Sequence, residues 1–164
     1  MNLDTSEIRI VSAFAGVGKT TLAAKHPSAF NDLTLGAYKY VIESEVSADS
    51  ERAKACPDTE MNLDWPNNYI AAIKKVLKSE KTILIPSDRL VLMLLQFEEV
   101  PYYLCYPQRK LKEEYQKRYI ARGNSDHFLE VFIGGWDLFM DSLESDSYGK
   151  HIVLKEGQFL SDIV

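Results

Sequence analysis

The feature that most constrains the fold of this chain is a glycine-rich turn near its start, within the run Ala13-Phe14-Ala15-Gly16-Val17-Gly18-Lys19-Thr20. Residues 8–14, which enter the turn, are apolar and rich in β-formers, so they predict a strand. Residues 19–25, which leave it, are compatible with a helix, and Pro27 stops that helix. A strand that passes through a tight turn directly into a helix is typical of α/β proteins.

The rest of the chain alternates in the same way. Further strands are expected at residues 29–33, 82–86, 101–106 and 152–154, and helices at 66–77, 90–97, 110–122 and 124–142, with a closing turn at 158–163. Parallel strands joined by helical crossovers account for this order. We therefore expect one domain over residues 1–164, an α/β three-layer sandwich with a five-stranded parallel sheet. Residues 34–61 are polar and irregular, and we expect loops there with at most a short helix.

The turn matches the Walker A phosphate-binding pattern, Gly-x-x-x-x-Gly-Lys-Ser/Thr, except that Ala13 replaces the first glycine. Two glycines let successive backbone N–H groups face one anion, and the helix N-terminus adds partial positive charge. Lys19 would reach the β- and γ-phosphates of a triphosphate, and the Thr20 hydroxyl would bind Mg²⁺. A glycine turn that merely happens to precede Lys-Thr is the alternative, and the flanking strand and helix argue against it. The residues expected to bind the nucleotide are Ala15, Gly16, Val17, Gly18, Lys19, Thr20 and Thr21.

The run from Ala13 to Thr21, near the start of so short a chain, resembles the P-loop nucleoside and nucleoside-monophosphate kinases. In that family an acceptor pocket follows the second strand, a mobile lid carrying arginines follows the fourth, and a loop after the fifth touches the adenine. The resemblance implies the nucleotide kinase-like P-loop NTPase fold, with ATP and Mg²⁺ as cofactors. It also implies transfer of the γ-phosphate to a nucleotide or nucleoside. The order of elements matches along most of the chain, but only the P-loop is a specific motif.

By this resemblance, residues 107–124 are a candidate lid segment. Arg118 and Arg122 are four residues apart, so a helix puts both on one face, where they would clamp the transferring phosphoryl group. Arg109 is a further candidate contact to the nucleotide, and Gly157 and Gln158 match the adenine loop by position. The alternative for the lid is a solvated charged helix in which Glu114 and Arg118 form an ordinary surface pair.

Two carboxylates and one tyrosine are candidates for the acceptor side. Asp32 follows the second strand, where it would orient the acceptor or take its proton; a turn Asp bonded to its own backbone is the alternative. Asp88 follows the strand at residues 82–86 as a candidate metal and substrate contact, although Pro86-Ser87 replace the family's usual Asp there. A helix cap is the other interpretation of Asp88. Tyr38 is the candidate for aromatic contact with the acceptor.

Net charge and composition restrict the classes of partner that this chain is expected to bind. The net charge of -5 argues against extensive nucleic-acid binding. The resemblance to P-loop kinases implies small-molecule nucleotides as substrates. The start of the chain lacks the features of a signal peptide, and no apolar run is long enough to span a bilayer, so we expect a cytoplasmic protein without membrane contact. The composition gives no indication of oligomeric state. The alternative function is a nucleotide-controlled binding module or an ATPase without a small-molecule acceptor.

Overall fold

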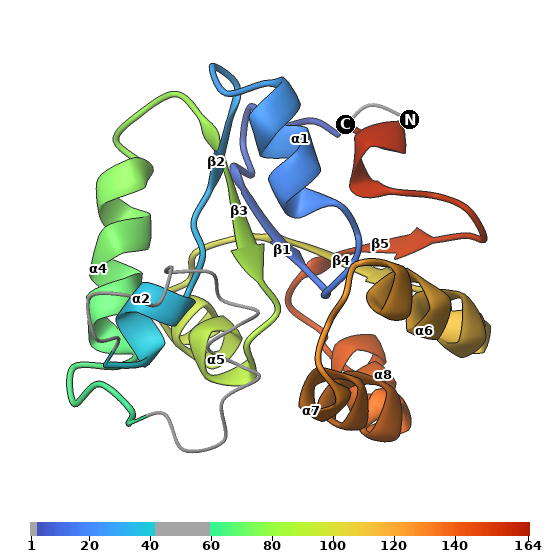
Figure 1. Cartoon of the computed structure of the whole chain (residues 1–164). Helices are drawn as coiled ribbons and strands as arrows, with labels where there is room; N and C mark the ends of the chain where they lie inside the picture. The colour runs from blue at the N-terminus through green and yellow to red at the C-terminus, as the bar shows by residue number, and fades with distance from the viewer. Residues whose placement is uncertain (1–2, 42–59) are drawn as a thin grey trace.

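The computed structural model describes residues 3–41 and 60–164, and a five-stranded sheet runs through its middle (Figure 1). The strands are β1 (Ile10–Ala13), β2 (Phe30–Asp32), β3 (Thr82–Pro86), β4 (Tyr103–Pro107) and β5 (Lys150–Leu154). Their spatial order is β2-β3-β1-β4-β5, and every neighbouring pair is parallel. The expected α/β class and five-stranded parallel sheet are therefore confirmed.

Helices occupy the connections between the strands. The helices are α1 (Lys19–Lys25), α2 (Gly36–Lys39), α4 (Asn67–Val76), α5 (Arg89–Phe97), α6 (Lys112–Ala121), α7 (Asp126–Leu129) and α8 (Trp136–Glu144). The 3₁₀ turns η1 (Arg109–Leu111) and η3 (Leu160–Asp162) and the π-helical segment η2 (Glu130–Gly134) complete the set. The connections from β1 to β2 and from β3 to β4 run in opposite directions across the sheet, so right-handed crossovers place α1 and α5 on opposite faces. Accordingly, α4 packs against α5, whereas α1 packs against η3 (Figure 1).

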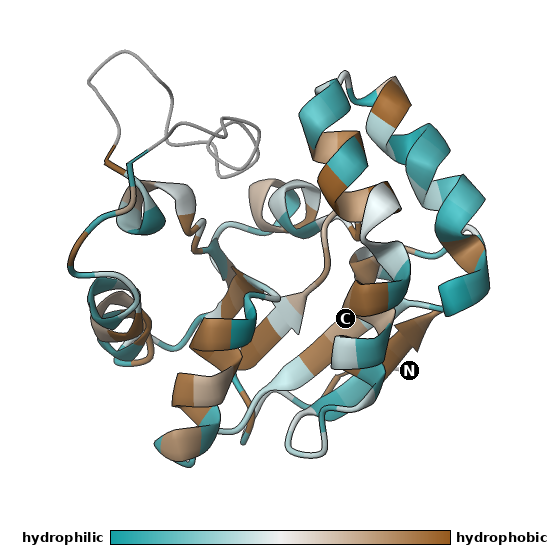
Figure 2. Cartoon of the chain, turned by 90° about the horizontal axis from the view of Figure 1, so that it is seen from below, coloured by the Kyte–Doolittle hydropathy of each residue, from teal (hydrophilic) through white to brown (hydrophobic). Residues whose placement is uncertain are grey.

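The core lies on both faces of the three central strands. Every residue of β1, β3 and β4 is buried, whereas β2 is half-buried and β5 is largely exposed, as edge strands are. Figure 2 shows the hydrophobic colour concentrated on these strands between the helices. Continuous apolar strands of this kind are expected where a parallel sheet is covered on both faces. No helix among the described residues has both the length and the apolar composition needed to cross a membrane.

One predicted helix is broken in the structure. Residues 124–142 were expected to form one helix, but they form α7, η2 and α8, with Ser125 as the N-cap of α7. Gly135 explains the interruption, because a Cβ atom there would lie 2.6 Å from the carbonyl oxygen of Val131. Any residue with a Cβ atom would clash with this carbonyl, so the local backbone requires glycine at position 135. The short helix allowed for in residues 34–61 is α2, and residues 42–59 lie outside the described part.

The topology identifies the edge of the sheet at which a ligand would bind. The chain leaves β1 toward β2 on one side of the sheet and leaves β4 toward β5 on the other. Since β1 and β4 are neighbours, their carboxyl ends open a crevice between diverging connections. The glycine-rich turn after β1 lies at this crevice.

Candidate functional site

The turn between β1 and α1 has the backbone shape that its glycines permit. Gly16 and Gly18 adopt φ angles of 83° and 96°, a left-handed conformation that other residues rarely adopt. Space is also restricted there. A Cβ atom on Gly16 would lie 2.8 Å from a ring carbon of Tyr119, and one on Gly18 would lie 3.3 Å from a ring carbon of Phe159. Both glycines are therefore required by conformation and by packing.

The carbonyl groups of the turn are all held by donors within the protein. The six acceptors and their partners are Ala13 O and Phe14 O with Lys19 Nζ (2.8 and 3.2 Å), Ala15 O with the Tyr119 hydroxyl (2.9 Å), Gly16 O with Arg118 (3.3 Å), Val17 O with Leu160 N (2.9 Å) and Gly18 O with Leu22 N (3.0 Å). Within the described ranges, the backbone N–H groups of residues 15–18 donate a hydrogen bond to no protein acceptor. Carbonyls fixed in this way leave the N–H groups available to an anion. Val17 contributes only its backbone, because its side chain is fully buried.

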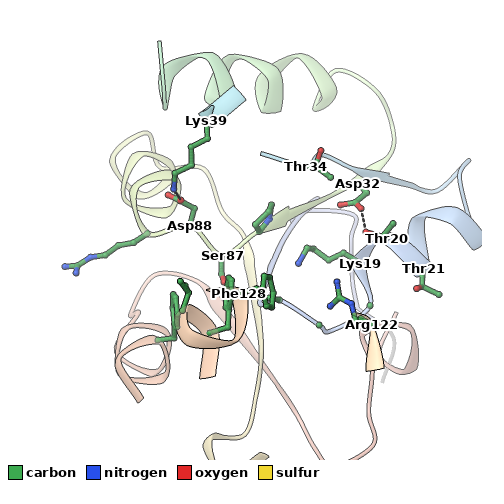
Figure 3. A pocket seen from close by; sticks show the side chains of 18 of the residues that line it. Lys19, Thr20, Thr21, Asp32, Thr34, Lys39, Ser87, Asp88, Arg122 and Phe128 are labelled. Atoms are coloured by element: carbon green, nitrogen blue, oxygen red, sulfur yellow. Dashed lines mark hydrogen bonds and ion pairs between the residues drawn. The ribbon is translucent and has the colours of Figure 1, made fainter. Parts of the chain in front are cut away.

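A hydroxyl and a carboxylate meet beside the turn. The Thr20 hydroxyl at the start of α1 donates to Asp32 Oδ2 at the end of β2, at 2.7 Å (Figure 3). The sequence prediction that both residues belong to the site is consistent with this contact. Hard oxygen ligands of this type suit Mg²⁺, which usually binds one or two carboxylates together with substrate phosphates. Across the described residues there is no group of three or more His, Cys, Asp or Glu side chains that would hold a metal alone.

The turn opens into a pocket of about 1060 Å³, slightly above the usual range for small-molecule sites. Its phosphate-loop end is formed by Ala15, Gly16, Gly18, Lys19, Thr20, Thr21, Asp32, Arg122 and Phe159. Its far end is formed by Lys39, Tyr40, Pro86, Ser87, Asp88, Arg89 and Leu90, and Thr34, Phe128, Val131, Phe132 and Phe139 complete the lining. Charged side chains thus line both ends. The aromatic wall adjoins the loop, because Phe132 and Phe139 pack against Phe14, with ring centroids 5.7 and 5.6 Å apart.

Arg122 reaches this pocket because of how α6 ends. Gly123 follows it with φ 73°, and its N–H donates to Ile120 O at 3.0 Å. The next N–H, of Asn124, donates to Tyr119 O at 3.1 Å, which completes a Schellman motif. The predicted helix end at Gly123 is therefore confirmed. Figure 3 shows Arg122 and Lys19 extending into the same region of the pocket from different elements.

Arg118 does not share this position, although it lies on the same helix. Its guanidinium group donates to Gly16 O and to Gln158 O (3.1 Å), pairs with Glu114, and does not line the pocket. The side chain is only 12% exposed, so Glu114 and Arg118 are not an ordinary surface pair either. The expectation that Arg118 and Arg122 act together on the ligand is thus not supported by the geometry.

Three further predicted nucleotide contacts lie away from the pocket. Arg109 forms ion pairs with carboxylates of α8, namely Asp137 (3.5 Å), Asp141 (2.5 Å) and Glu144 (2.7 Å). Gly157 donates its N–H to Glu114 at 3.2 Å, and the Gln158 side chain accepts from Lys155 N. The structure therefore corrects the placement of Arg109, Gly157 and Gln158, because their polar groups are engaged by the protein outside the pocket. Phe159, which was not predicted, is the residue of this segment that lines it.

Asp88 is a helix cap, as one of the two interpretations predicted. Its Oδ1 accepts from Leu90 N (3.0 Å) and Val91 N (3.3 Å), and its Oδ2 pairs with Lys39 Nζ at 2.8 Å. Both side chains of the pair are mostly shielded from solvent, at 20% and 14% exposure. Asp88 lines the pocket, but a metal ion there would have to compete with Lys39. Asp32 is the better placed carboxylate for the ion that Thr20 would bind.

Two aromatic residues that line the pocket, Phe128 and Phe132, were missed by sequence reasoning. Tyr38 was the predicted acceptor contact, but its ring packs against Tyr69, with centroids 5.3 Å apart, and does not line the pocket. Phe128 and Phe132 have rings stacked 4.4 Å apart, and both belong to the segment that was expected to be helical. Their i, i+4 spacing looks like ordinary core packing in the sequence. Tyr40, two residues beyond Tyr38, is also at the pocket.

Behind the phosphate loop, Cys105 contributes packing and no chemistry. It pairs with Ala13 across β1 and β4 and is fully buried. Burial raises the pKa of its thiol to about 12, and the nearby charge of Lys19 only partly opposes that rise. The thiol is therefore neutral at ordinary pH, and Cys105 serves as a small core residue.

The site thus joins a glycine turn with two left-handed residues, a cationic end and an aromatic wall in one cavity at the crevice of a parallel sheet. No protein-family model matches the sequence, and no curated protein is significantly similar to it. The functional assignment therefore depends on the residues and geometry of this chain.

Proposed function

We propose that this chain is a P-loop phosphotransferase of the nucleotide kinase-like fold, which binds ATP and transfers its γ-phosphate to a nucleotide or nucleoside. The observation that carries the proposal is the shape of the turn at Gly16 and Gly18. Positive φ angles at both residues, six occupied carbonyls and N–H groups left available by the described residues form a concave anion site. Lys19 adds a positive charge at its edge.

Mg²⁺ fits the residues beside the turn. Thr20 and Asp32 would hold it, directly or through water, and its chemistry is to neutralise charge on the phosphates. Lys19 has a second role, because its Nζ also holds Ala13 O and Phe14 O (2.8 and 3.2 Å). An ammonium group carries three N–H donors, so the same group would hold these carbonyls and contact a phosphate as a point charge.

The transfer step uses the two ends of the pocket. An oxygen atom of the acceptor forms a bond to the γ-phosphorus, and the bond from that phosphorus to the bridging oxygen breaks, which releases ADP. A hydroxyl acceptor loses its proton, which Asp32 would accept. Arg122 stabilises charge on the transferring group. The far end, lined by Lys39, Tyr40 and Asp88, receives the acceptor.

Calorimetric titration with ATP and Mg²⁺ tests the donor site. Lys19→Ala should weaken ATP binding by about tenfold to a hundredfold, because it removes a charge-assisted contact. The control is Lys25→Ala, an exposed residue in the last turn of the same helix, which should bind ATP as the wild type does. Failure of the wild type to bind ATP would refute the proposal.

Labelled ATP with a panel of nucleosides and nucleoside monophosphates tests the reaction itself. Transfer to one acceptor class, lost in Lys19→Ala, is the expected result. ATP binding without transfer to any acceptor would favour the second candidate, a nucleotide-controlled binding module or ATPase. That candidate is motivated by Pro86-Ser87 in place of a carboxylate at the end of β3, and by the engagement of Asp88 with Lys39.

A further inference from the structure

Arg118 is held by five protein groups beside the phosphate loop. Its guanidinium donates to Gly16 O (3.3 Å) and Gln158 O (3.1 Å), and its central carbon lies 4.6 and 4.0 Å from the ring centroids of Tyr115 and Phe159. Glu114 pairs with it from the preceding helical turn. A guanidinium group suits this place because it is planar, stacks on rings and donates in fixed directions. It could not keep these contacts and also reach a phosphate in the pocket.

The segment after β5 is attached to the same loop. Leu160 N donates to Val17 O at 2.9 Å, Phe159 covers Gly18, and Gly157 N donates to Glu114. Gly16, Val17 and Gly18 are therefore each contacted by Arg118 or by residues 157–160. The segment and the loop are far apart in sequence, and Arg118 lies between them.

These contacts fix the direction of the N–H groups that would bind phosphate. In a trans peptide unit the C=O of one residue and the N–H of the next point in opposite directions. Holding Gly16 O outward therefore turns the N–H of Val17 toward the pocket side, and holding Val17 O does the same for the N–H of Gly18. Without these donors the glycine peptides could rotate, because glycine allows both signs of φ.

We propose that Arg118 is a positioning residue that keeps the phosphate loop in its anion-binding shape by joining it to residues 157–160. The inference rests on the proposed function, since it assigns a task within triphosphate binding. It differs from a clamp on the transferring phosphoryl group in what it predicts. A clamp acts mainly on turnover, whereas a support for the loop acts equally on every ligand that uses the loop, whether or not transfer occurs.

The test compares Arg118→Lys and Arg118→Gln with Arg122→Gln, a control one helical turn further along. Binding of ATP and ADP with Mg²⁺, and of tripolyphosphate, is measured by calorimetry. Both Arg118 variants should weaken all three ligands by similar factors of about tenfold, because a lysine keeps the charge but cannot hold two carbonyls and two rings. Arg122→Gln should leave ADP affinity within about twofold and lower turnover. Wild-type ADP affinity in Arg118→Lys, with reduced turnover, would overturn the inference.

Amide hydrogen exchange gives a readout that needs no nucleotide. The Leu160 N–H, bonded to Val17 O, should exchange at least about tenfold faster in the Arg118 variants, while amides of the β3 core should not change. If the wild type bound no ligand, the proposed function would fail, yet this measurement would still decide whether Arg118 joins the two segments. Should the Arg118 variants not fold, Glu114→Ala removes one partner of Arg118 and of Gly157, and unchanged exchange at Leu160 would then count against the inference.

Discussion

At the phosphate-loop end of the pocket, the shape of the site is set by backbone groups, whereas at the far end it is set by side chains. Gly16 and Gly18 fix the first end through φ angles of 83° and 96°, and donors from α6 and η3 fix its carbonyls. The far end depends on the Lys39–Asp88 ion pair and on the side chains that line the pocket beside it. A backbone site recognises a general chemical group, and a side-chain site selects among molecules that carry it.

Substitution of Gly16 by alanine is the strongest test of the backbone end. An alanine there must adopt φ 83° and place its Cβ 2.8 Å from the Tyr119 ring, so the loop must deform. We expect ATP affinity to fall by about a hundredfold or more, since several N–H donors lose their direction together. Gly157→Ala is the matched control, because it shares the positive φ, 71°, but has open space around its Cβ. It should lower stability by about 1–2 kcal/mol and leave ATP affinity unchanged.

Asp32→Asn tests the carboxylate that accepts from Thr20 and would bind Mg²⁺. The amide keeps the size of the side chain and an acceptor for the Thr20 hydroxyl, but it removes the charge beside the expected Mg²⁺. The Mg²⁺ concentration for half-maximal transfer should rise by about tenfold or more, with ATP binding in the absence of Mg²⁺ unchanged. The maximal rate should also fall, because an amide cannot accept the proton of the acceptor hydroxyl. Asp88→Asn is the comparison, because Asp88 was the other predicted metal ligand. A larger Mg²⁺ effect in Asp88→Asn than in Asp32→Asn would reverse the assignment.

The two ends also differ in how far the sequence predicted them. Gly16, Gly18, Lys19 and Thr20 were identified because the backbone shape needs particular residues at fixed spacing. The parallel sheet was predicted for a similar reason, since short apolar strands alternate with helices. Arg118 and Arg122 were given one role because helical periodicity places both on one face, yet it does not show which carbonyls or rings surround each residue.

The rest of the pocket was hidden for a different physical reason. Part of its wall comes from η2, the π-helical segment that ends at Gly134, and Phe132 lines the pocket from this break in the helix. Lys39 forms an ion pair with Asp88, which lies 49 positions away in the sequence. No local sequence pattern reveals such a contact. Side-chain sites assembled from distant elements depend on tertiary packing, so residue type and spacing alone do not identify them.

Asp88→Ala tests how the far end is supported. The alanine removes the acceptor for Leu90 N and Val91 N and leaves Lys39 without its partner. We expect the free energy of unfolding in urea to fall by about 1–2 kcal/mol, whereas Asp88→Asn, which still caps the helix, should lose less. ATP affinity should be unchanged in both variants, because neither touches the phosphate loop. Equal stability of Asp88→Ala and wild type would show that the cap contributes little.

The smallest effect is expected from Arg109→Gln. This variant tests whether an arginine of the candidate lid segment contributes to ATP binding when it lies outside the pocket. Arg109 was a candidate nucleotide contact because it begins the segment that resembles a lid, but its guanidinium pairs with three carboxylates of α8. ATP affinity and turnover should therefore stay within about twofold of wild type, since a pair on the surface is screened by water and salt. Arg122→Gln, at the other end of α6, should lower turnover in the same assay. A loss of ATP binding in Arg109→Gln would mean that the segment rearranges to bring Arg109 to the phosphates, and the contrast between a preformed backbone end and a side-chain end would no longer hold.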